Sequence, residues 1–242
     1  MHTSALSEGK PIANVHADID AAAAQRKARF WNKVARKYAR DPIADMAGYE
    51  KTLQRVQALL SPDHEVLEIG CGTGSTALRL APGTRRLLAT DVSAEMVAIA
   101  REKLAAQPVP QLEFRVADAD TPLSLSPSFD AVLAFNVLHL VEDLPGALQA
   151  AMDALKPGGL FISKTPCLND MNPLIPKLAL PLMRALGKAP HVLCFNAEQL
   201  QEDLAWQGLD IVSVEWHASS KGKDYRPFIV ARKPLVHQAP PH

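Results

Sequence analysis

Apolar residues along this chain follow two spacings, one typical of buried strands and one typical of helices. Short apolar runs of strand length, bounded by polar residues, glycine or proline, predict strands at 65–69, 86–90, 112–116, 130–135, 160–165, 210–217 and 227–232. Apolar residues that recur every three or four positions predict helices at 75–81, 94–106, 143–155 and 197–207. Asn196 and Gln199 are spaced as a capping box at the start of the last helix.

Alternating strands and helices with short connections predict an α/β fold. We expect one doubly wound, mostly parallel sheet of seven strands. Lys156-Pro157-Gly158-Gly159 predicts the turn that follows the helix at 143–155. No helix separates the last two strands, 210–217 and 227–232, so the last strand is expected to be antiparallel and to lie at the sheet edge.

Two helices are predicted before the first strand. The first begins at a cap provided by Asp20, ends near Arg40, and carries Trp31 and Tyr38 on one apolar face. Asp41-Pro42 ends it, and a second helix begins near Ile43. We therefore divide the chain into a tail and helical cap (1–61, with 1–19 loosely attached), a main domain (62–233) and a second tail (234–242).

Residues 166–195 break the strand–helix rhythm. They are rich in proline and in apolar residues, and a connection of this length is usually functional or disordered. Their apolar content argues against disorder. Two interpretations stay open: a lid over an active site, or a helical insertion that covers one edge of the sheet.

Charge is balanced overall but not locally. The 242 residues include 26 basic and 26 acidic side chains, so no global field favours nucleic acid or membrane as a partner. Residues 21–40 carry basic side chains and no acid, which fits a solvated helix face or, alternatively, a nucleic-acid or membrane surface. We expect no nucleic-acid partner and no integral membrane association, and the oligomeric state is left open.

Cysteine usage and the N-terminus indicate the compartment. The three cysteines, Cys71, Cys167 and Cys194, lack CxxC spacing, which suggests a reducing environment without a disulfide framework. Neither a signal-peptide core nor a transmembrane run stands out. A cytoplasmic protein is expected. His191 and Cys194 are too few to predict a metal site, so no metal is expected.

The most informative segment is Val66-Leu67-Glu68-Ile69-Gly70-Cys71-Gly72-Thr73-Gly74-Ser75. It predicts a strand, a glycine turn and a helix, a corner that presents backbone N–H groups to an anionic ligand. Asp91, at the end of the second strand, is placed to accept both hydroxyls of a ribose. Asp118 follows the third strand, so the three strand ends outline a nucleoside site.

These motifs resemble those of the class I S-adenosylmethionine-dependent methyltransferases. Glu68-x-Gly70-x-Gly72-x-Gly74 is similar to the first motif of that family. The matching later runs are Ala89-Thr90-Asp91-Val92-Ser93, Val116-Ala117-Asp118-Ala119-Asp120, Phe129-Asp130-Ala131-Val132 and Leu155-Lys156-Pro157-Gly158-Gly159. The resemblance covers about residues 62–165 and is greatest to the small-molecule branch that includes the ubiquinone and menaquinone C-methyltransferases. It implies a Rossmann-like fold.

The resemblance also implies roles for individual residues. Those implied to bind S-adenosylmethionine, with S-adenosylhomocysteine as product, are Glu68 (methionine ammonium), Gly70, Cys71, Gly72 and Gly74 (methionine portion), Asp91 (ribose), Val92 and Met96 (adenine face), Asp118 and the Ala119 N–H (adenine edge), and Asn136 (sulfonium end). Glu68 could instead be an ordinary cap or buried acid, and Met96 could belong only to the core. Candidates beside the acceptor are Trp31, Tyr38, His139 and His191, with Tyr38 and His139 as candidate catalytic residues, while Tyr49 is a further lid candidate.

The predicted function is methyl transfer to a small-molecule acceptor by in-line displacement. The protein mainly aligns the acceptor and excludes water, so the sequence does not identify the acceptor atom or show whether a base is used. One alternative is a cofactor-binding partner or regulatory protein without transfer activity. Another is an NAD-dependent oxidoreductase, which is disfavoured because Ser75 stands at the third glycine position of a dinucleotide turn.

Overall fold

The computed structural model describes residues 12–121, 123, 128–171, 174, 177, 180–185, 189–218 and 225–235, apart from the side chains of 12–21 and 184–185. The predictions for the tails at 1–11 and 236–242, and for residues 172–173, 175–176, 178–179 and 186–188 of the segment 166–195, lie outside the described residues. Among the residues that are described, no helix has both the length and the apolar character needed to cross a bilayer.

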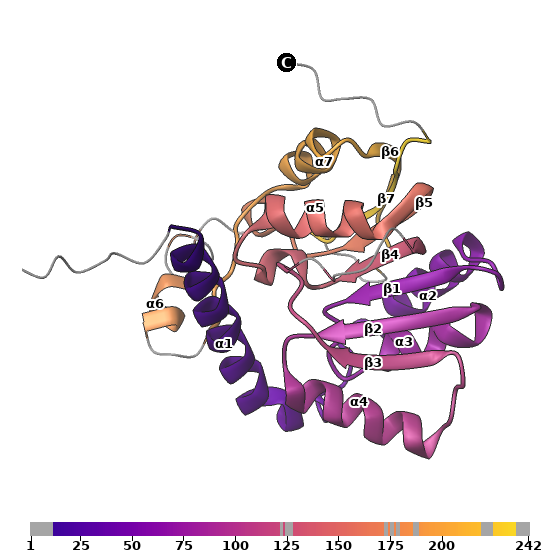
Figure 1. Ribbon diagram of the computed structural model, residues 1–242, viewed down its shortest axis with the longest axis horizontal. Helices are drawn as coiled ribbons and strands as arrows, with labels where there is room; N and C mark the ends of the chain where they lie inside the picture. The colour runs from indigo at the N-terminus through magenta and orange to yellow at the C-terminus, as the bar shows by residue number, and fades with distance from the viewer. Residues whose placement is uncertain are drawn as a thin grey trace, which may run out of the picture.

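Seven strands form one sheet: β1 (Glu65–Ile69), β2 (Arg86–Asp91), β3 (Leu112–Val116), β4 (Phe129–Phe135), β5 (Leu155–Lys164), β6 (Asp210–Glu215) and β7 (Phe228–Arg232). The strand order is β3-β2-β1-β4-β5-β7-β6 (Figure 1). Neighbours from β3 to β5 pair in parallel, and β7 is antiparallel to both β5 and β6. The predicted α/β class, the mostly parallel sheet and the antiparallel last strand are confirmed.

The predicted place of the antiparallel strand is wrong. β7 lies inside the sheet, and β6 forms the edge. The burial of the two strands explains this order. The apolar positions of β7 are buried on both faces, whereas β6 alternates between more and less exposed residues and suits an edge.

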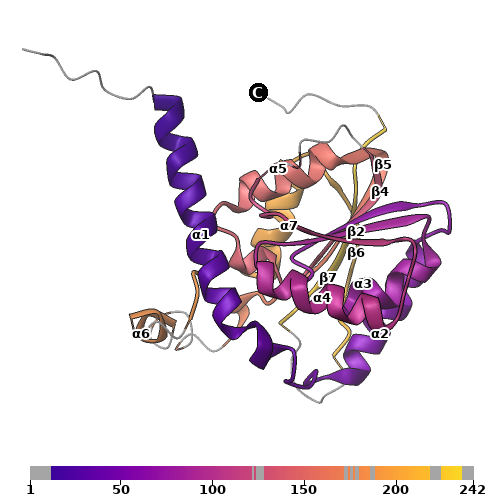
Figure 2. The ribbon, with the colours of Figure 1, turned by 60° about the horizontal axis from the view of Figure 1, so that its bottom comes forward.

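Helices cover both faces of the sheet (Figures 1 and 2). The helical elements are α1 (Ile12–Tyr38), α2 (Met46–Leu59), α3 (Ser75–Leu80), η1 (Ala81–Gly83), α4 (Ala94–Ala106), η2 (Leu138–Leu140), α5 (Leu144–Ala154), η3 (Leu168–Asp170), α6 (Leu180–Ala185) and α7 (Ala197–Trp206). One core lies between the sheet and α5 and α7, and the other between the sheet and α2, α3 and α4. Strand β4 feeds both, since Val132 and Ala134 belong to the first core and Ala131 and Leu133 to the second.

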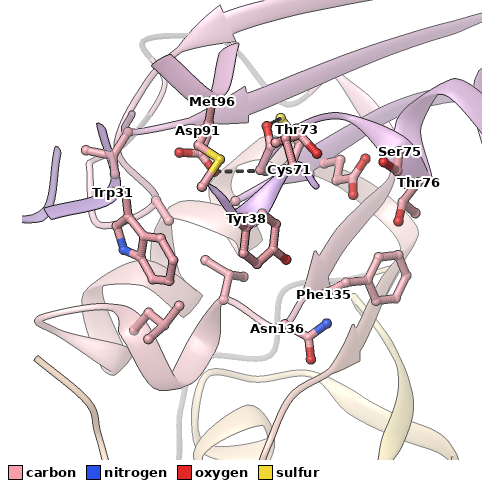
Figure 3. Close-up of a pocket in the computed structure, with 18 of the residues that line it drawn as sticks. Trp31, Tyr38, Cys71, Thr73, Ser75, Thr76, Asp91, Met96, Phe135 and Asn136 are labelled. Carbon is pink, nitrogen blue, oxygen red and sulfur yellow. Dashed lines mark hydrogen bonds between the residues drawn. The ribbon is translucent and has the colours of Figure 1, made fainter. Parts of the chain in front are cut away.

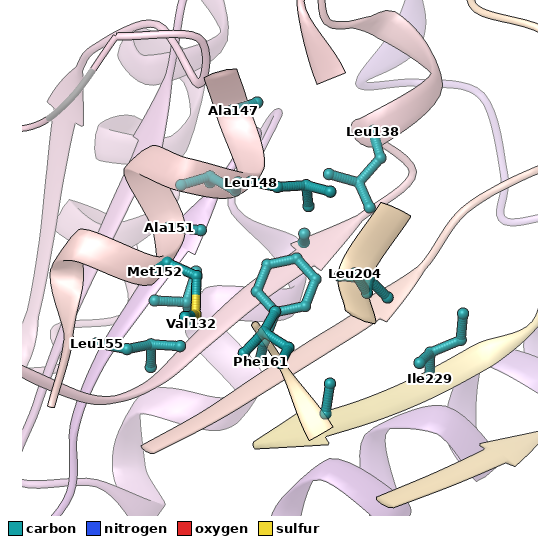
Figure 4. Packing of buried hydrophobic residues seen from close by; sticks show 14 of the residues in the cluster. Val132, Leu138, Ala147, Leu148, Ala151, Met152, Leu155, Phe161, Leu204 and Ile229 are labelled. Carbon is teal, nitrogen blue, oxygen red and sulfur yellow. The ribbon is translucent and has the colours of Figure 1, made fainter. Parts of the chain in front are cut away.

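Phe161 on β5 occupies the middle of the first core. Its side chain is fully buried, with Leu148 and Met152 of α5 on one side and Leu204 of α7 on another (Figure 4). Burial of an aromatic side chain of this size stabilises the fold by about 1.5–3 kcal/mol. This core fixes the strands whose ends carry the site.

Several predicted boundaries shift. The Asp20 cap is wrong, because α1 begins at Ile12 and continues through the alanine-rich run that follows. Helix α2 begins at Met46 rather than near Ile43, since Asp45 caps it by accepting a hydrogen bond from the Gly48 N–H at 2.9 Å. The capping box of Asn196 and Gln199 is present at the start of α7.

The predicted turn at 156–159 is absorbed into strand β5. Helix α5 ends at Ala154 and the strand begins at the next residue. Gly158, in the left-handed region with φ of 80°, donates its N–H to the Lys233 carbonyl at 2.9 Å. Because Lys233, the residue after β7, pairs with Gly158 and Gly159, strand β5 extends through the predicted turn.

Candidate cofactor and acceptor site

The carboxyl ends of β1, β2, β3 and β4 surround one cavity of about 450 Å³. Helix α1 runs across this edge of the sheet and closes one side of the cavity (Figures 1 and 2). Of the residues that the sequence nominates, the lining includes Trp31, Tyr38, Glu68, Gly70, Cys71, Gly72, Asp91, Val92, Met96, Asp118, Ala119 and Asn136. Ligands of open α/β sheets bind at this edge.

The glycine turn between β1 and α3 forms the floor of the cavity. Gly70, Gly72 and Gly74 have φ values of 66°, 54° and 74°, which side chains rarely tolerate. A Cβ on Gly70 would lie 2.4 Å from Val137 Cγ2, and one on Gly74 would lie 2.5 Å from Phe114 Cζ. Gly74 therefore supports the turn from behind rather than lining the cavity.

Glu68 is a buried acid with an unpartnered oxygen. Its side chain is 2% exposed, and no described group bonds to Oε2. Burial, and then the nearby charge of Asp91, raises the pKa of Glu68 to about 8. A carboxyl in this state is suited to receive a cation, which would restore its ordinary ionisation.

Asp91 joins β2 to the glycine turn. Its Oδ2 accepts the Gly72 N–H at 2.9 Å, and its Oδ1 accepts the Ser93 N–H at the same distance. Burial raises the pKa of Asp91, while these two hydrogen bonds oppose the rise. Each oxygen retains a lone pair, so the carboxylate can accept two further hydroxyl groups.

Asp118 and Met96 define the opposite end of the cavity. Met96 is 2% exposed and packs in a small core with Ala35 and Ile99, while its side chain also lines the cavity. Met96 therefore belongs both to the core and to the cavity lining. The Asp118 Oδ1 accepts a hydrogen bond from Lys27 at 2.6 Å, so helix α1 reaches this end of the site as well.

Tyr38 projects into the cavity between Asp91 and Asn136 (Figure 3). Its Cε1 lies 3.8 Å from the position that a Cβ of Gly72 would occupy, and its ring packs edge-on against Trp31 with centroids 6.4 Å apart. Burial, and then the charge of Asp91, raises the pKa of Tyr38 above its ordinary 10.0. At neutral pH the phenol is thus a hydrogen-bond donor over the glycine turn.

Asn136 and Phe135 form the wall after β4 (Figure 3). Asn136 has φ of 53°, a left-handed backbone that asparagine tolerates better than most residues. Its N–H donates to the Lys164 carbonyl at 2.8 Å, which fixes the turn. On the facing side, the Tyr49 hydroxyl lies 3.3 Å from Thr76 Oγ1.

The two nominated histidines do not line the cavity. His139 Nδ1 lies 2.9 Å from Thr165 Oγ1, and burial lowers the pKa of His139 to about 4. His191 Nδ1 lies 3.5 Å from Glu142 Oε2. Within the described part of the chain, no three His, Cys, Asp or Glu side chains gather as a metal site.

The sequence does not single out Lys27, which lines the cavity, or Asp120, which pairs with it. Lys27 belongs to the basic run at 21–40, yet its side chain is 7% exposed and pairs with Asp118 and Asp120. A signal was present in the spacing, because Lys27 and Trp31 lie four residues apart and therefore share a helix face. Asp120 gave no signal beyond its place beside Asp118.

Comparisons with known proteins agree with this geometry. A family model described as "Methyltransferase domain" matches residues 66–159. The ubiquinone biosynthesis O-methyltransferase of Sinorhizobium medicae is 26% identical over 224 residues, which cover 85% of this chain and 86% of that protein.

Solved structures share the fold. A possible histamine N-methyltransferase from Thermotoga maritima superposes with a TM-score of 0.63 at 22% identity, covering 85% of this chain and 99% of the other. Phosphoethanolamine N-methyltransferase 2 of Haemonchus contortus, solved with S-adenosylmethionine, gives 0.63 at 18% identity and covers 77% and 53%. The family model and the curated relative support a class I S-adenosylmethionine-dependent methyltransferase, and the solved structures share its fold.

Proposed function

We propose that this methyltransferase moves a methyl group from S-adenosylmethionine to an apolar small-molecule acceptor held in the same cavity. The observation that carries the proposal is the pairing of one buried, unpartnered carboxyl, Glu68, with a cavity of about 450 Å³ that has aromatic and aliphatic walls. That volume lies in the range of small-molecule sites.

The residues that would bind the methyl donor are assigned to its parts in turn. We assign Glu68 to the methionine ammonium, Asp91 to the ribose hydroxyls, and Asp118 with the Ala119 N–H to the adenine edge. Val92 and Met96 would flank the adenine ring. Gly70 and Gly72 would let the backbone pass beneath the methionine portion beside Cys71, and Gly74 would hold the turn from behind. The available oxygens of Glu68 and Asp91 fit this assignment.

When bound, the cofactor supplies an electrophilic methyl group on sulfur, and the chain's own residues bring the acceptor into line with it. Tyr38 and Asn136 flank the position where the two ligands would meet, so they orient the acceptor and exclude water. Trp31 extends the apolar wall on α1. Because His139 and His191 lie off the cavity, Tyr38 is the residue that we propose beside the reacting atoms.

A binding experiment and a transfer assay test this function. Calorimetric titration should show binding of S-adenosylhomocysteine and no binding of NAD. Isotope-labelled S-adenosylmethionine should then transfer label to at least one of a panel of thiols, amines, phenols and quinol precursors. Binding without transfer to any acceptor would favour the partner or regulatory alternative, and binding of NAD alone would refute the donor assignment.

A further inference from the structure

A buried lysine on α1 bridges two carboxylates at the adenine end of the cavity. Lys27 Nζ lies 2.6 Å from Asp118 Oδ1 and also contacts Asp120 Oδ2, and the three side chains are 7%, 11% and 16% exposed. Burial disfavours the charge, but the hydrogen bonds to the two acids outweigh it and raise the pKa of Lys27. An ammonium this buried is tolerated only when it is paired.

The bridge also holds the carboxylates in place. Asp120 Oδ2 accepts the Glu142 N–H at 2.9 Å, and Asp118 Oδ1 accepts the Asp120 N–H at 3.3 Å. The hydrogen bonds that described residues donate to the Asp118 carboxylate thus converge on Oδ1. Asp118 lines the cavity, which leaves Oδ2 as the carboxylate oxygen available to a ligand.

The placement of Lys27 on α1 links this end of the cavity to the other. Lys27, Trp31 and Tyr38 lie at spacings of four and seven residues, which put them on one stripe of the helix, and all three line the cavity. Arg36 on the same helix points elsewhere and pairs with Glu102 of α4 at the surface.

We propose that Lys27 is a specificity-determining positioning residue for the nucleobase: it holds Asp118 oriented so that Oδ2 selects a base carrying an amino group. This inference rests on the proposed function, in which Asp118 meets the adenine edge. A fixed carboxylate accepts from the 6-amino group of adenine and repels the 6-oxygen of hypoxanthine. Sites built on one such hydrogen bond can discriminate strongly against the analogue that lacks the donor.

The test compares two ligands in three proteins. Titration calorimetry would give the dissociation constants of S-adenosylhomocysteine and of its 6-oxo analogue, S-inosylhomocysteine, for wild type, Lys27→Met and Arg36→Gln. We expect Lys27→Met to lower the preference for the adenosyl ligand at least about fivefold, because Asp118 is then free to turn. Arg36→Gln removes a different ion pair of α1, to Glu102 of α4, without touching the cavity, and should keep the wild-type preference.

A cycle with Asp118→Asn separates positioning from a structural role. Asp118→Asn should lower the same preference, and adding Lys27→Met to it should lower the preference no further. Lys27→Arg, which retains the cation, should recover part of it. The ratio of two ligands in one protein is insensitive to a general loss of folded protein.

The results that would refute the role of Lys27 differ from the result that would refute the proposed function. A preference unchanged in Lys27→Met, or additive effects in the double variant, would make Lys27 a structural ion pair only. Failure of the wild type to bind S-adenosylhomocysteine would instead overturn the proposed function itself.

Discussion

The burial of Glu68 should lower the stability of the free protein above its ordinary pKa, and this cost can be measured. In the folded free protein the carboxyl is buried without a partner for Oε2, and its pKa is raised from 4.5 to about 8. The unfolded chain ionises this group above its ordinary pKa, but the folded chain keeps it protonated until the pH approaches 8. Stability therefore falls as the pH rises between these two values.

The size of the effect follows from the pKa shift. One unit of pKa corresponds to about 1.36 kcal/mol, so raising the pH from about 5 to 8 should cost wild type about 3 kcal/mol through this group. Glu68→Gln cannot titrate and should lose this component. In a chain of this length the corresponding difference in melting temperature is roughly 6–12 °C. The same variant should bind S-adenosylhomocysteine at least about tenfold more weakly at pH 8, since a charged hydrogen bond is lost.

Thermal unfolding of wild type and Glu68→Gln across this pH range measures the first effect, and calorimetric titration measures the second. Glu65→Gln is a matched control, because Glu65 lies at the other end of β1 and does not line the cavity. If the difference in stability between wild type and Glu68→Gln is the same at pH 5 and pH 8, the buried carboxyl does not titrate as argued. Unchanged affinity would remove Glu68 from the ammonium site.

Three further predictions follow from the site. Gly74→Ala should destabilise the fold by on the order of 2–4 kcal/mol in chemical denaturation, because its Cβ would lie 2.5 Å from Phe114 Cζ at a φ of 74°. The control is Gly83→Ala, where a Cβ meets nothing within 4 Å, and it should cost less than about 1 kcal/mol. Asp91→Ala should weaken S-adenosylhomocysteine at least about tenfold by titration, and an unchanged affinity would end the ribose assignment. His139→Gln should leave the pH profile of methyl transfer unchanged between about pH 6 and pH 8, since the imidazole, with a pKa of about 4, is already neutral there. If the variant instead lost an ionisation step from this profile, His139 would again be a candidate base.

The fold was largely predictable because its strands are short, apolar and evenly separated by helices. The order of the last two strands was not predictable, because the hydrophobic pattern of a strand does not show which strand it pairs with. In the structure β7 is buried on both faces and lies inside the sheet, whereas β6 is more exposed and forms the edge. The start of α1 was misplaced for a similar reason: Asp20 suits a helix cap, but alanine-rich helix continues on both sides of it.

The site was predictable where motif and strand end coincide, as at Glu68, Asp91 and Asp118. It was not predictable where distant segments meet. The pairing of Lys27 with Asp118 joins residues 91 positions apart, and no local pattern encodes it. The histidines illustrate the converse, since both are predicted from their positions in the chain and neither lines the cavity. The division into domains, the lid role of 166–195 and the cytoplasmic location stay predictions.

The interior position of β7 has a consequence for synthesis. Strand β6 pairs with β7, and β7 in turn pairs with β5, so within the described chain β6 reaches the rest of the sheet through a strand made after it. While Phe228–Arg232 is still inside the ribosomal exit tunnel, the edge of β5 is unpaired and β6 lacks the strand it pairs with. The parallel strands β1 to β5, four of which end at the cavity, can pair earlier, whereas β6 can join the sheet only after β7 has left the exit tunnel.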